Sequence, residues 1–156
     1  IAQEVALSVV HAVEIDPDAY SWAKRNIIEH GQGRVHLHPE DMADCLPELN
    51  GQVDLVISNP PYIPPGAVPP DPEVRDYDPH RALYGSGEDG LGEIRAVERT
   101  ARRLLRPGGL VAVEHADEQG NAVFWLFSEE RGWRDVTIRK DLTGRDRFVT
   151  ARFGQE

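Results

Sequence analysis

The sequence predicts an α/β fold with a mainly parallel sheet, helices on both faces of that sheet and an antiparallel hairpin at its C-terminal end. Short apolar runs such as 53–57 alternate with longer segments, such as 91–105, whose apolar residues recur at helical spacing. The last two strand-like segments, 133–142 and 148–153, are separated only by the turn 143–147. So short a connection implies antiparallel pairing.

The first elements are the tail of a helix over 1–7 and a strand over 9–15. Glu14 lies at the carboxyl end of this strand. In a doubly wound sheet, a carboxylate at this place can accept hydrogen bonds from both hydroxyls of a nucleoside ribose. We therefore expect Glu14 to bind a ribose, and the alternative is that Glu14 or Asp16 only opens the helix that follows.

A helix is expected over 18–30. Asp16 and Pro17 before it have the pattern of an N-cap residue followed by proline at the first helical position. Gly31 suits the position just after the helix. The expected inward stripe consists of Ala19, Ala23 and Ile27.

The strand expected over 34–38 alternates between apolar residues and histidines. His36 and His38 could share a metal ion, but no third ligand accompanies them, so no metal site is expected. Beyond this strand, Asp41 could accept a hydrogen bond from the amino group of an adenine, and Met42 could pack on the adenine ring. The alternative is that Asp41 is a helix N-cap.

The strand Val53–Ser58 is an apolar, β-branched run that we expect to be buried on both faces, and it stops at Asn59-Pro60-Pro61-Tyr62. Neither a helix nor a central strand continues through two prolines, because proline has no backbone N–H. In an open parallel sheet, ligands bind at the carboxyl ends of the strands. Asn59 and Tyr62 should therefore lie at the edge of a binding crevice.

The chemistry of this tetrapeptide suits a planar amino group, which is a poor nucleophile because its lone pair is delocalised. Two oxygens could accept hydrogen bonds from both N–H groups and draw the lone pair back to the nitrogen: the side-chain oxygen of Asn59 and the carbonyl of Pro60. Pro61 stiffens the frame, and Tyr62 could form a flat wall for a planar substrate group. The alternative is a proline-rich turn with a buried tyrosine.

The segment 63–90 is expected to lack regular structure, because it holds six prolines among glycines and acidic residues. We predict that it forms a lid or a substrate wall over the Asn59 site, with Arg75 and Arg81 as its basic residues. A flexible linker is the alternative.

The remaining segments complete the sheet. A crossover helix is expected over 91–105, followed by a turn over 106–109 and a buried strand over 110–113 that leads into Glu114. A second amphipathic helix is expected over 118–130. Its inward residues should be Ala122, Val123, Leu126 and Phe127, and Gly132 should end it.

Composition limits the possible functions. The 156 residues suit one domain, and 40% hydrophobic with 28% charged residues describe a globular, soluble protein. The net charge of −10 argues against a large non-specific nucleic-acid surface. The single cysteine, Cys45, allows no internal disulfide and fits a reducing cytoplasm. No apolar run is long enough to span a membrane, and the start at Ile1 resembles neither a signal peptide nor a natural start.

Several motifs together resemble the HemK-type (PrmC-type) glutamine methyltransferases of peptide chain release factors, over essentially the whole chain. The motif Asn59-Pro60-Pro61-Tyr62 alone is shared with many amino-group methyltransferases, whereas the combination is much more specific. The other matching motifs are Val74-Arg75-Asp76-Tyr77-Asp78-Pro79, Ala82-Leu83-Tyr84-Gly85, Asp89-Gly90-Leu91, Pro107-Gly108-Gly109, Glu114, Gln119-Gly120 and Leu142-Thr143-Gly144-Arg145-Asp146-Arg147.

The resemblance implies a Rossmann-like class I fold that uses S-adenosylmethionine as the methyl donor and releases S-adenosylhomocysteine. The methyl group would pass to the side-chain N5 of the glutamine in the Gly-Gly-Gln loop of a release factor. The resemblance also implies a cytoplasmic protein, expected to be a monomer without direct nucleic-acid contact. Its protein partners would be the release factors.

By motif, the donor would be held by Glu14 at the ribose, by Asp41 and Met42 at the adenine, and by Asn59 next to the methyl group. The target amide would be bound by the whole tetrapeptide, Asn59, Pro60, Pro61 and Tyr62, with Asn59 and Pro60 as the catalytic residues. Glu114 could structure the pocket floor or be a surface carboxylate.

Two features of the resembled family are missing from the sequence. The first strand with its Gly-rich loop should lie just before Ile1, and a helical N-terminal domain should meet the protein substrate. We therefore expect residues 1–156 to be the catalytic domain, incomplete at its N-terminus, and the activity to belong to the intact protein. The alternatives are a nucleic-acid amino-methyltransferase acting on adenine N6 or guanine N2, and a non-catalytic fragment.

Overall fold

The computed structural model describes residues 1–69 and 71–154. The chain divides into two compact units, Ile1–Cys45 and Leu46–Glu156, and each is described by itself. Within the described residues, no helix has the length and apolarity that crossing a membrane requires.

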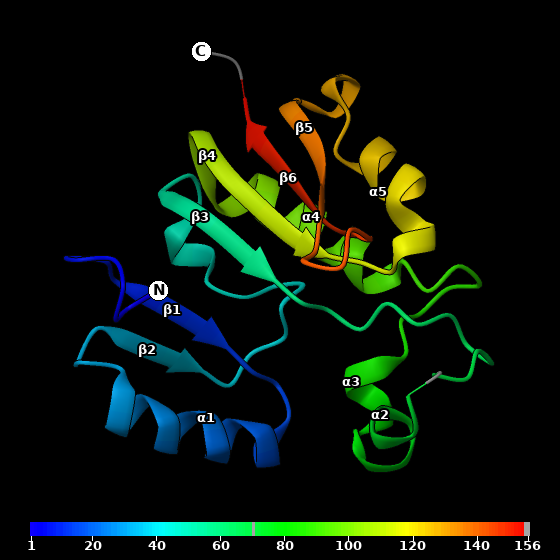
Figure 1. The fold of residues 1–156 in the computed structure, drawn as a ribbon. Coiled ribbons are helices and arrows are strands. Elements are labelled where there is room, and N and C mark those ends of the chain that lie inside the picture. Colours follow the sequence, from blue (N-terminus) through cyan, green and yellow to red (C-terminus); the bar gives the residue numbers. More distant parts are fainter. Residues whose placement is uncertain (70, 155–156) are drawn as a thin grey trace. The chain divides into compact units, whose positions relative to one another are not determined.

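The unit Ile1–Cys45 is a β-α-β element. Its strands β1 (Val10–Val13) and β2 (Val35–His38) pair in parallel, with Val10 opposite Val35. Helix α1 (Pro17–His30) connects them and contacts β2 (Figure 1). A parallel pair needs such a crossover, because both strands must run in the same direction.

Helix α1 begins as predicted. The Asp16 carboxylate accepts hydrogen bonds from the backbone N–H groups of Asp18 at 2.9 Å and Ala19 at 3.0 Å, and Pro17 occupies the first helical position. The helix ends before Gly31 as predicted, but Gly31 has a right-handed conformation, with φ −77°. A Cβ at Gly31 would lie 2.5 Å from the Ile27 carbonyl oxygen, so close packing favours glycine here. The half-buried residues of α1 are Tyr20, Ala23 and Ile27, so Tyr20 takes the inward place expected for Ala19.

The predicted helix tail over 1–7 is wrong. The segment forms two successive turns, in which Val5 N–H donates to the Ile1 carbonyl at 2.8 Å and Ser8 N–H donates to the Val5 carbonyl at 3.3 Å. The Arg34 guanidinium donates to the carbonyls of Ala2 and Val5, and Leu7 has φ +66°. These carbonyls therefore have a side-chain partner, and a residue in the left-handed region lies in the second turn.

The unit Leu46–Glu156 contains a four-stranded sheet in the order β3–β4–β6–β5 (Figure 1). Its strands are β3 (Val53–Ser58), β4 (Leu105–Glu114), β5 (Trp133–Lys140) and β6 (Asp146–Phe153). β3 and β4 are parallel, whereas β6 is antiparallel to both β4 and β5. The predicted α/β class, with parallel pairing and a C-terminal antiparallel hairpin, is confirmed.

Two longer helices pack on this sheet. Helix α4 (Gly92–Leu104) contacts β3 and β4, α5 (Gly120–Leu126) contacts β5 and β6, and the two helices contact each other. The shorter elements are η1 (Pro47–Leu49), α2 (Pro72–Tyr77), α3 (His80–Leu83), η2 (Asp117–Gln119) and η3 (Glu129–Arg131). The core between helices and sheet includes Ile94, Leu105, Val111, Val113, Val123, Phe127, Trp133 and Val149, all nearly or fully buried.

Several predicted boundaries differ from the structure. The crossover helix ends at Leu104. The expected turn 106–109 is an irregularity inside β4: Val53 of β3 pairs with Leu105, but Leu55 pairs with Leu110, so the register shifts between them. The expected helix 118–130 is broken into η2, α5 and η3, with Val123 and Phe127 buried as predicted but Ala122 exposed. Gly132 ends this region as expected, at φ +85°.

Strand β3 is not buried on both faces as predicted. Leu55 is 37% exposed and Ile57 is 60% exposed. They pair with Leu110 and Ala112 of β4, which are only half-buried, whereas Val111 on the opposite face is fully buried. Helices α4 and α5 therefore lie on the face that carries Val111, and Leu55 and Ile57 lie on the other face.

The segment 63–90 has more regular structure than predicted. Helix α2 is capped by the Asp71 carboxylate, which accepts from Glu73 N–H at 3.0 Å, and Pro72 occupies the first helical position. This arrangement repeats that of Asp16 and Pro17 at α1. Proline at the start of a helix costs no hydrogen bond, and here prolines begin short helices.

Candidate active site

The motif Asn59-Pro60-Pro61-Tyr62 directly follows the last residue of β3. Asn59 is exposed, Pro60 is buried, and Pro61 and Tyr62 are half-buried. Within the described part of the chain, neither the Asn59 carboxamide nor the Pro60 carbonyl has a hydrogen-bond partner. Both oxygens can therefore accept hydrogen bonds from a bound molecule.

The Tyr62 ring has a fixed orientation. Its hydroxyl donates to Oε1 of the half-buried Glu114, at the carboxyl end of β4, over 3.0 Å. Burial raises the pKa of Tyr62 above 10.0, and the charge of Glu114 and this hydrogen bond raise it further, while Arg147 acts in the opposite direction. The phenol is therefore neutral at physiological pH and donates to a carboxylate.

The hairpin turn next to this pair is ordered by Asp141. Its carboxylate accepts from the Thr143 hydroxyl at 2.6 Å, the Thr143 N–H at 2.8 Å, the Arg145 N–H at 3.1 Å and the Arg147 guanidinium at 3.3 Å. These hydrogen bonds, that of the Thr143 hydroxyl first, lower the pKa of Asp141. The turn thus holds Arg147 by an ionised carboxylate.

The main chain after the motif is held by the segment before α4. Ile63 N–H donates to the Leu83 carbonyl and Gly85 N–H donates to the Ile63 carbonyl, each at 3.0 Å. Gly90 has φ +71°, and a Cβ there would lie 2.6 Å from the Tyr62 carbonyl oxygen. Only glycine allows this backbone approach.

Gln119 joins these segments, and the sequence analysis assigned it no role. Its side-chain nitrogen donates to the carbonyls of Tyr62 at 2.9 Å and Asp89 at 3.0 Å, and its side-chain oxygen accepts from Ala116 N–H at 3.0 Å. A glutamine at the third position of a helical turn that bonds back to the N-cap backbone is a capping signal that sequence inspection could have found. The contacts with Tyr62 and Asp89 have no such local signal.

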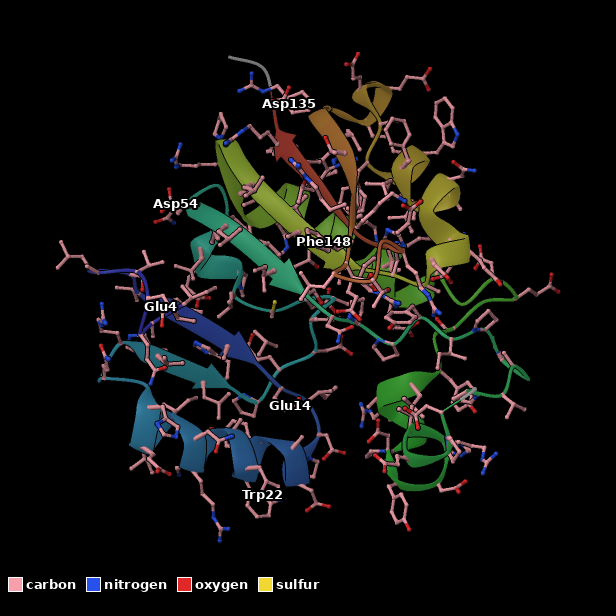
Figure 2. All side chains as sticks on the ribbon, in the orientation of Figure 1. Glu4, Glu14, Trp22, Asp54, Asp135 and Phe148 are labelled. Carbon is pink, nitrogen blue, oxygen red and sulfur yellow. The ribbon has the colours of Figure 1, made fainter. Side chains whose placement is uncertain are left out.

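Glu14 lies in the other unit, directly after β1 (Figure 2). Its N–H continues the parallel pairing by donating to the His38 carbonyl at 3.0 Å, and its Oε1 accepts from Asp16 N–H at 2.7 Å. Asp16 provides the cap of α1, so the alternative role of opening the helix belongs to Asp16. The second carboxylate oxygen of Glu14 is bonded to no residue that the structure describes.

Asp41 and Met42 follow β2 in the same unit as Glu14. The Asp41 carboxylate accepts from Ala43 N–H at 2.9 Å, and Asp44 N–H donates to the Asp41 carbonyl at 3.2 Å. The alternative of a helix N-cap is wrong, because this segment is a turn and not a helix. Asp41 is exposed and Met42 is half-buried.

His36 and His38 lie beside a third histidine. The Nδ1 of His11 lies 3.0 Å from Nε2 of His38, and the rings of His11 and His36 have centroids 5.1 Å apart. Among the residues that the structure describes, no group of three or more His, Cys, Asp or Glu side chains is arranged to hold a metal ion.

Curated proteins with similar sequences carry one recurring name. The chain is 56% identical to the "Release factor glutamine methyltransferase" of Streptomyces coelicolor and 47% identical to that of Mycolicibacterium smegmatis, each over 97% of this chain and 53% of the relative. A "4-amino-L-phenylalanine/4-methylamino-L-phenylalanine methyltransferase" of Streptomyces pristinaespiralis is 43% identical over 89% of this chain and 46% of its own length. The chain spans about half the length of the curated relatives it matches. No family model matches it.

Solved structures with the same fold include methyltransferases and a cyclase. A methyltransferase from Pyrococcus furiosus has a TM-score of 0.67 at 23% identity, over 99% of this chain and 67% of that one. A predicted O-methyltransferase from Agrobacterium tumefaciens has a TM-score of 0.66 at 16% identity, over 99% and 67%. A [4+2]-cyclase also has the fold, with a TM-score of 0.64 at 12% identity, over 99% and 69%. The fold alone therefore does not define the reaction.

The sequence comparison is more specific, because identities of 41–56% over 97% of the chain recur with one name in three bacteria. Along nearly its whole length, the chain is a homologue of the bacterial release factor glutamine methyltransferases, and it has the class I methyltransferase fold.

Proposed function

We propose that the full-length protein carrying this chain transfers a methyl group from S-adenosylmethionine to the side-chain N5 of the glutamine in the Gly-Gly-Gln loop of peptide chain release factors. One observation carries the proposal. The Asn59 side-chain oxygen and the Pro60 carbonyl directly follow a parallel strand, and neither has a hydrogen-bond partner among the described residues. The chain that carries them is a homologue of release factor glutamine methyltransferases. The alternative of a nucleic-acid amino-methyltransferase is not favoured by these relatives.

The target amide nitrogen needs both alignment and a change in its electrons. The Asn59 and Pro60 oxygens accept its two N–H groups and favour a nitrogen whose lone pair points away from the amide plane. Pro60 and Pro61 have fixed φ angles, which restricts the main chain that carries the two oxygens. The Tyr62 ring, oriented by Glu114, is the wall beside the amide. Most of the rate enhancement then comes from positioning.

For the donor, we propose that Glu14 binds the ribose and that Asp41 and Met42 bind the adenine. Glu14 has a carboxylate oxygen without a described partner at the end of β1, which fits the hydroxyls of a ribose. Asp41 also has an oxygen beyond the one that accepts from Ala43. S-adenosylmethionine, when bound, supplies a methyl group on a sulfonium centre that needs no further activation.

The test is methyl transfer by the full-length protein with purified substrates. Labelled S-adenosylmethionine should label a release factor, and peptide mass spectrometry should place the methyl group on the glutamine of Gly-Gly-Gln. The control substrate is the same factor with that glutamine replaced by alanine. Labelling only of tRNA, rRNA or DNA, or only of a small aromatic amine, would contradict the proposal.

The remaining parts of the proposal concern the setting of the reaction. We propose that release factors are the protein partners, that the enzyme acts as a cytoplasmic monomer, and that it contacts no nucleic acid directly. We also propose that residues 1–156 belong to the catalytic domain. Light scattering of the full-length protein, alone and with a release factor, gives the stoichiometry.

A further inference from the structure

Gln119 bonds the end of the motif to two other segments at once. It is half-buried in η2, beyond the end of β4. Through the three hydrogen bonds given above, it connects Ala116 after β4, Tyr62 at the end of the motif and Asp89 in the loop before α4. We call this arrangement the Gln119 bridge.

The polarity of the three partners suits only a glutamine. The Tyr62 and Asp89 carbonyls require N–H donors, whereas Ala116 N–H requires an acceptor. A carboxamide offers two donors on nitrogen and an acceptor on oxygen, and this network also fixes which end is nitrogen. A glutamate would face the two carbonyls with a charged acceptor, and an asparagine is shorter by one methylene group.

The Tyr62 main chain is connected to the two oxygens through a restricted backbone. Pro60 and Pro61 have fixed φ angles, and a residue before proline is restricted in ψ, so the chain from Asn59 to Pro61 behaves as a nearly rigid segment. Ile63 is bonded through both its N–H and its carbonyl, and Gly90 packs against the Tyr62 carbonyl. A shift at Tyr62 therefore reaches the Pro60 carbonyl and the Asn59 main chain through few free torsion angles.

We propose that Gln119 is a positioning residue for methyl transfer, and that its bridge fixes the Tyr62 main chain so that the Asn59 and Pro60 oxygens meet the target amide. This inference rests on the proposed function. Gln119 acts through Tyr62 and makes no contact with the reacting atoms.

The kinetic test compares two isosteric changes in the full-length enzyme. Gln119→Glu retains the acceptor for Ala116 N–H but removes both donors. Gln52→Glu is the matched control, because the exposed Gln52 side chain donates to a single backbone carbonyl, that of Glu48 at 2.8 Å. Gln119→Glu should lower kcat about 10²-fold, the size of effect expected for a small displacement, and should leave the donor Kd nearly unchanged. Gln52→Glu should leave both constants unchanged.

The pH dependence separates positioning from a general structural effect. A protonated glutamic acid can donate to one of the two carbonyls, and these acceptors favour its neutral form. The kcat deficit of Gln119→Glu should therefore shrink as the pH is lowered, relative to the wild type and to Gln52→Glu. A deficit that does not change with pH, or an unchanged kcat at neutral pH, overturns the proposal.

A spectroscopic test does not depend on the reaction. If the bridge positions Tyr62, then the shorter and uncharged Gln119→Asn should weaken the hydrogen bond from the Tyr62 hydroxyl to Glu114. Tyr62, whose pKa is raised above 10.0, should then ionise at lower pH in an ultraviolet titration. Gln119→Glu is not used for this readout, because its added negative charge would itself raise the pKa of Tyr62. An unchanged titration in Gln119→Asn overturns the bridge, even if the wild type methylates no release factor. Loss of donor binding in both variants would assign Gln119 to general stability and also overturn the proposal.

Discussion

At the scale of single residues, Asn59 and Glu14 are predicted to serve different molecules, and substitutions can separate the two roles. Asn59→Ala in the full-length enzyme should lower kcat by about 10²-fold or more, because one preorganised polar group next to the reacting atoms is lost. The donor Kd should change little. Glu14→Ala should instead weaken donor binding first.

Isothermal calorimetry with S-adenosylmethionine and steady-state kinetics with a release factor measure both effects. Asn50→Ala is a suitable control, since Asn50 is an exposed carboxamide that accepts from Arg103 at 2.6 Å in the turn before β3. An equal loss of donor binding in Asn59→Ala would place Asn59 in the donor pocket only.

The Tyr62 hydroxyl gives a second prediction at this scale. The chain has four tyrosines, and the pKa of Tyr62 is raised by burial and by Glu114. The folded pKa lies above the unfolded value of 10.0, so the stabilisation by neutral Tyr62 is present below pH 10 and is lost as pH rises through the folded pKa.

Absorbance at alkaline pH should show one tyrosine that ionises after the others. Tyr62→Phe should remove that transition, and Glu114→Gln should move it to lower pH, while Tyr77→Phe should leave it in place because Tyr77 is 84% exposed. A late transition that survives Tyr62→Phe would disprove this assignment.

Local sequence signals accounted for some site residues and not for others. The Asp16 cap and the Asn59 turn could be predicted, because each depends on its immediate neighbours in the chain. The bond from Tyr62 to Glu114 spans 52 residues and that from Gln119 to Tyr62 spans 57. Such contacts depend on strand order, which no local pattern contains.

At the scale of elements, two helices share an Asp-Pro start and provide a matched comparison. Asp16 caps the fourteen-residue α1, and Asp71 caps the six-residue α2; neither helix has a fully buried residue. Each substitution by alanine should cost its helix about 1 kcal/mol. Asp71→Ala should melt α2 locally, because a helix of only six residues opens more readily than the fourteen-residue α1.

Hydrogen exchange and urea unfolding distinguish the two cases. Asp71→Ala should lose amide protection over 75–78 with little change in the free energy of global unfolding, whereas Asp16→Ala should lower the free energy with which its unit unfolds. Global destabilisation by Asp71→Ala would show that α2 is part of the cooperative core.

Elements were predictable where a strong periodic pattern coincided with an end signal. α1 and α4 were found almost to their ends. The helix 118–130 was too long, because its apolar spacing continues through the η2 and η3 turns. The helices α2 and α3 were not predicted, because the many prolines of this segment favoured a prediction of irregular structure. Two of these prolines, Pro72 and Pro79, lie at helix starts, where proline is favourable or tolerated.

At the scale of the molecule, Trp133 connects the sheet of the larger unit to its helices. It is 1% exposed, its Nε1 donates to Glu98 of α4 at 2.8 Å, and its ring centroid lies 5.2 Å from that of Phe127 and 5.3 Å from that of Phe153. Trp133→Phe leaves the buried Glu98 carboxylate, 3% exposed, without this donor. The free energy of unfolding should fall by about 2–3 kcal/mol.

Urea unfolding of Trp133→Phe, Glu98→Gln and the double variant measures this connection. The double variant should lose less stability than the sum of the single variants, because the shared hydrogen bond is counted once. Strict additivity would show that the two side chains contribute independently.

The fold class was predictable from the alternation of helix and strand patterns, and its parallel and antiparallel parts followed from connection lengths. The order β3–β4–β6–β5, with the last strand inserted next to β4, was not predicted. Nor was the exposure of Leu55 and Ile57, since an apolar run does not reveal how many of its faces are covered.

The hydrogen bond between Tyr62 and Glu114 also restricts how this protein can diverge. Replacing the tyrosine by phenylalanine removes a hydrogen-bond donor from the half-buried Glu114 carboxylate. Such a change is therefore tolerated best when residue 114 also becomes neutral. Substitutions at positions 62 and 114 should therefore occur together among homologues. A homologue with phenylalanine at 62 and an acid at 114 should be less stable than one with phenylalanine at 62 and glutamine at 114.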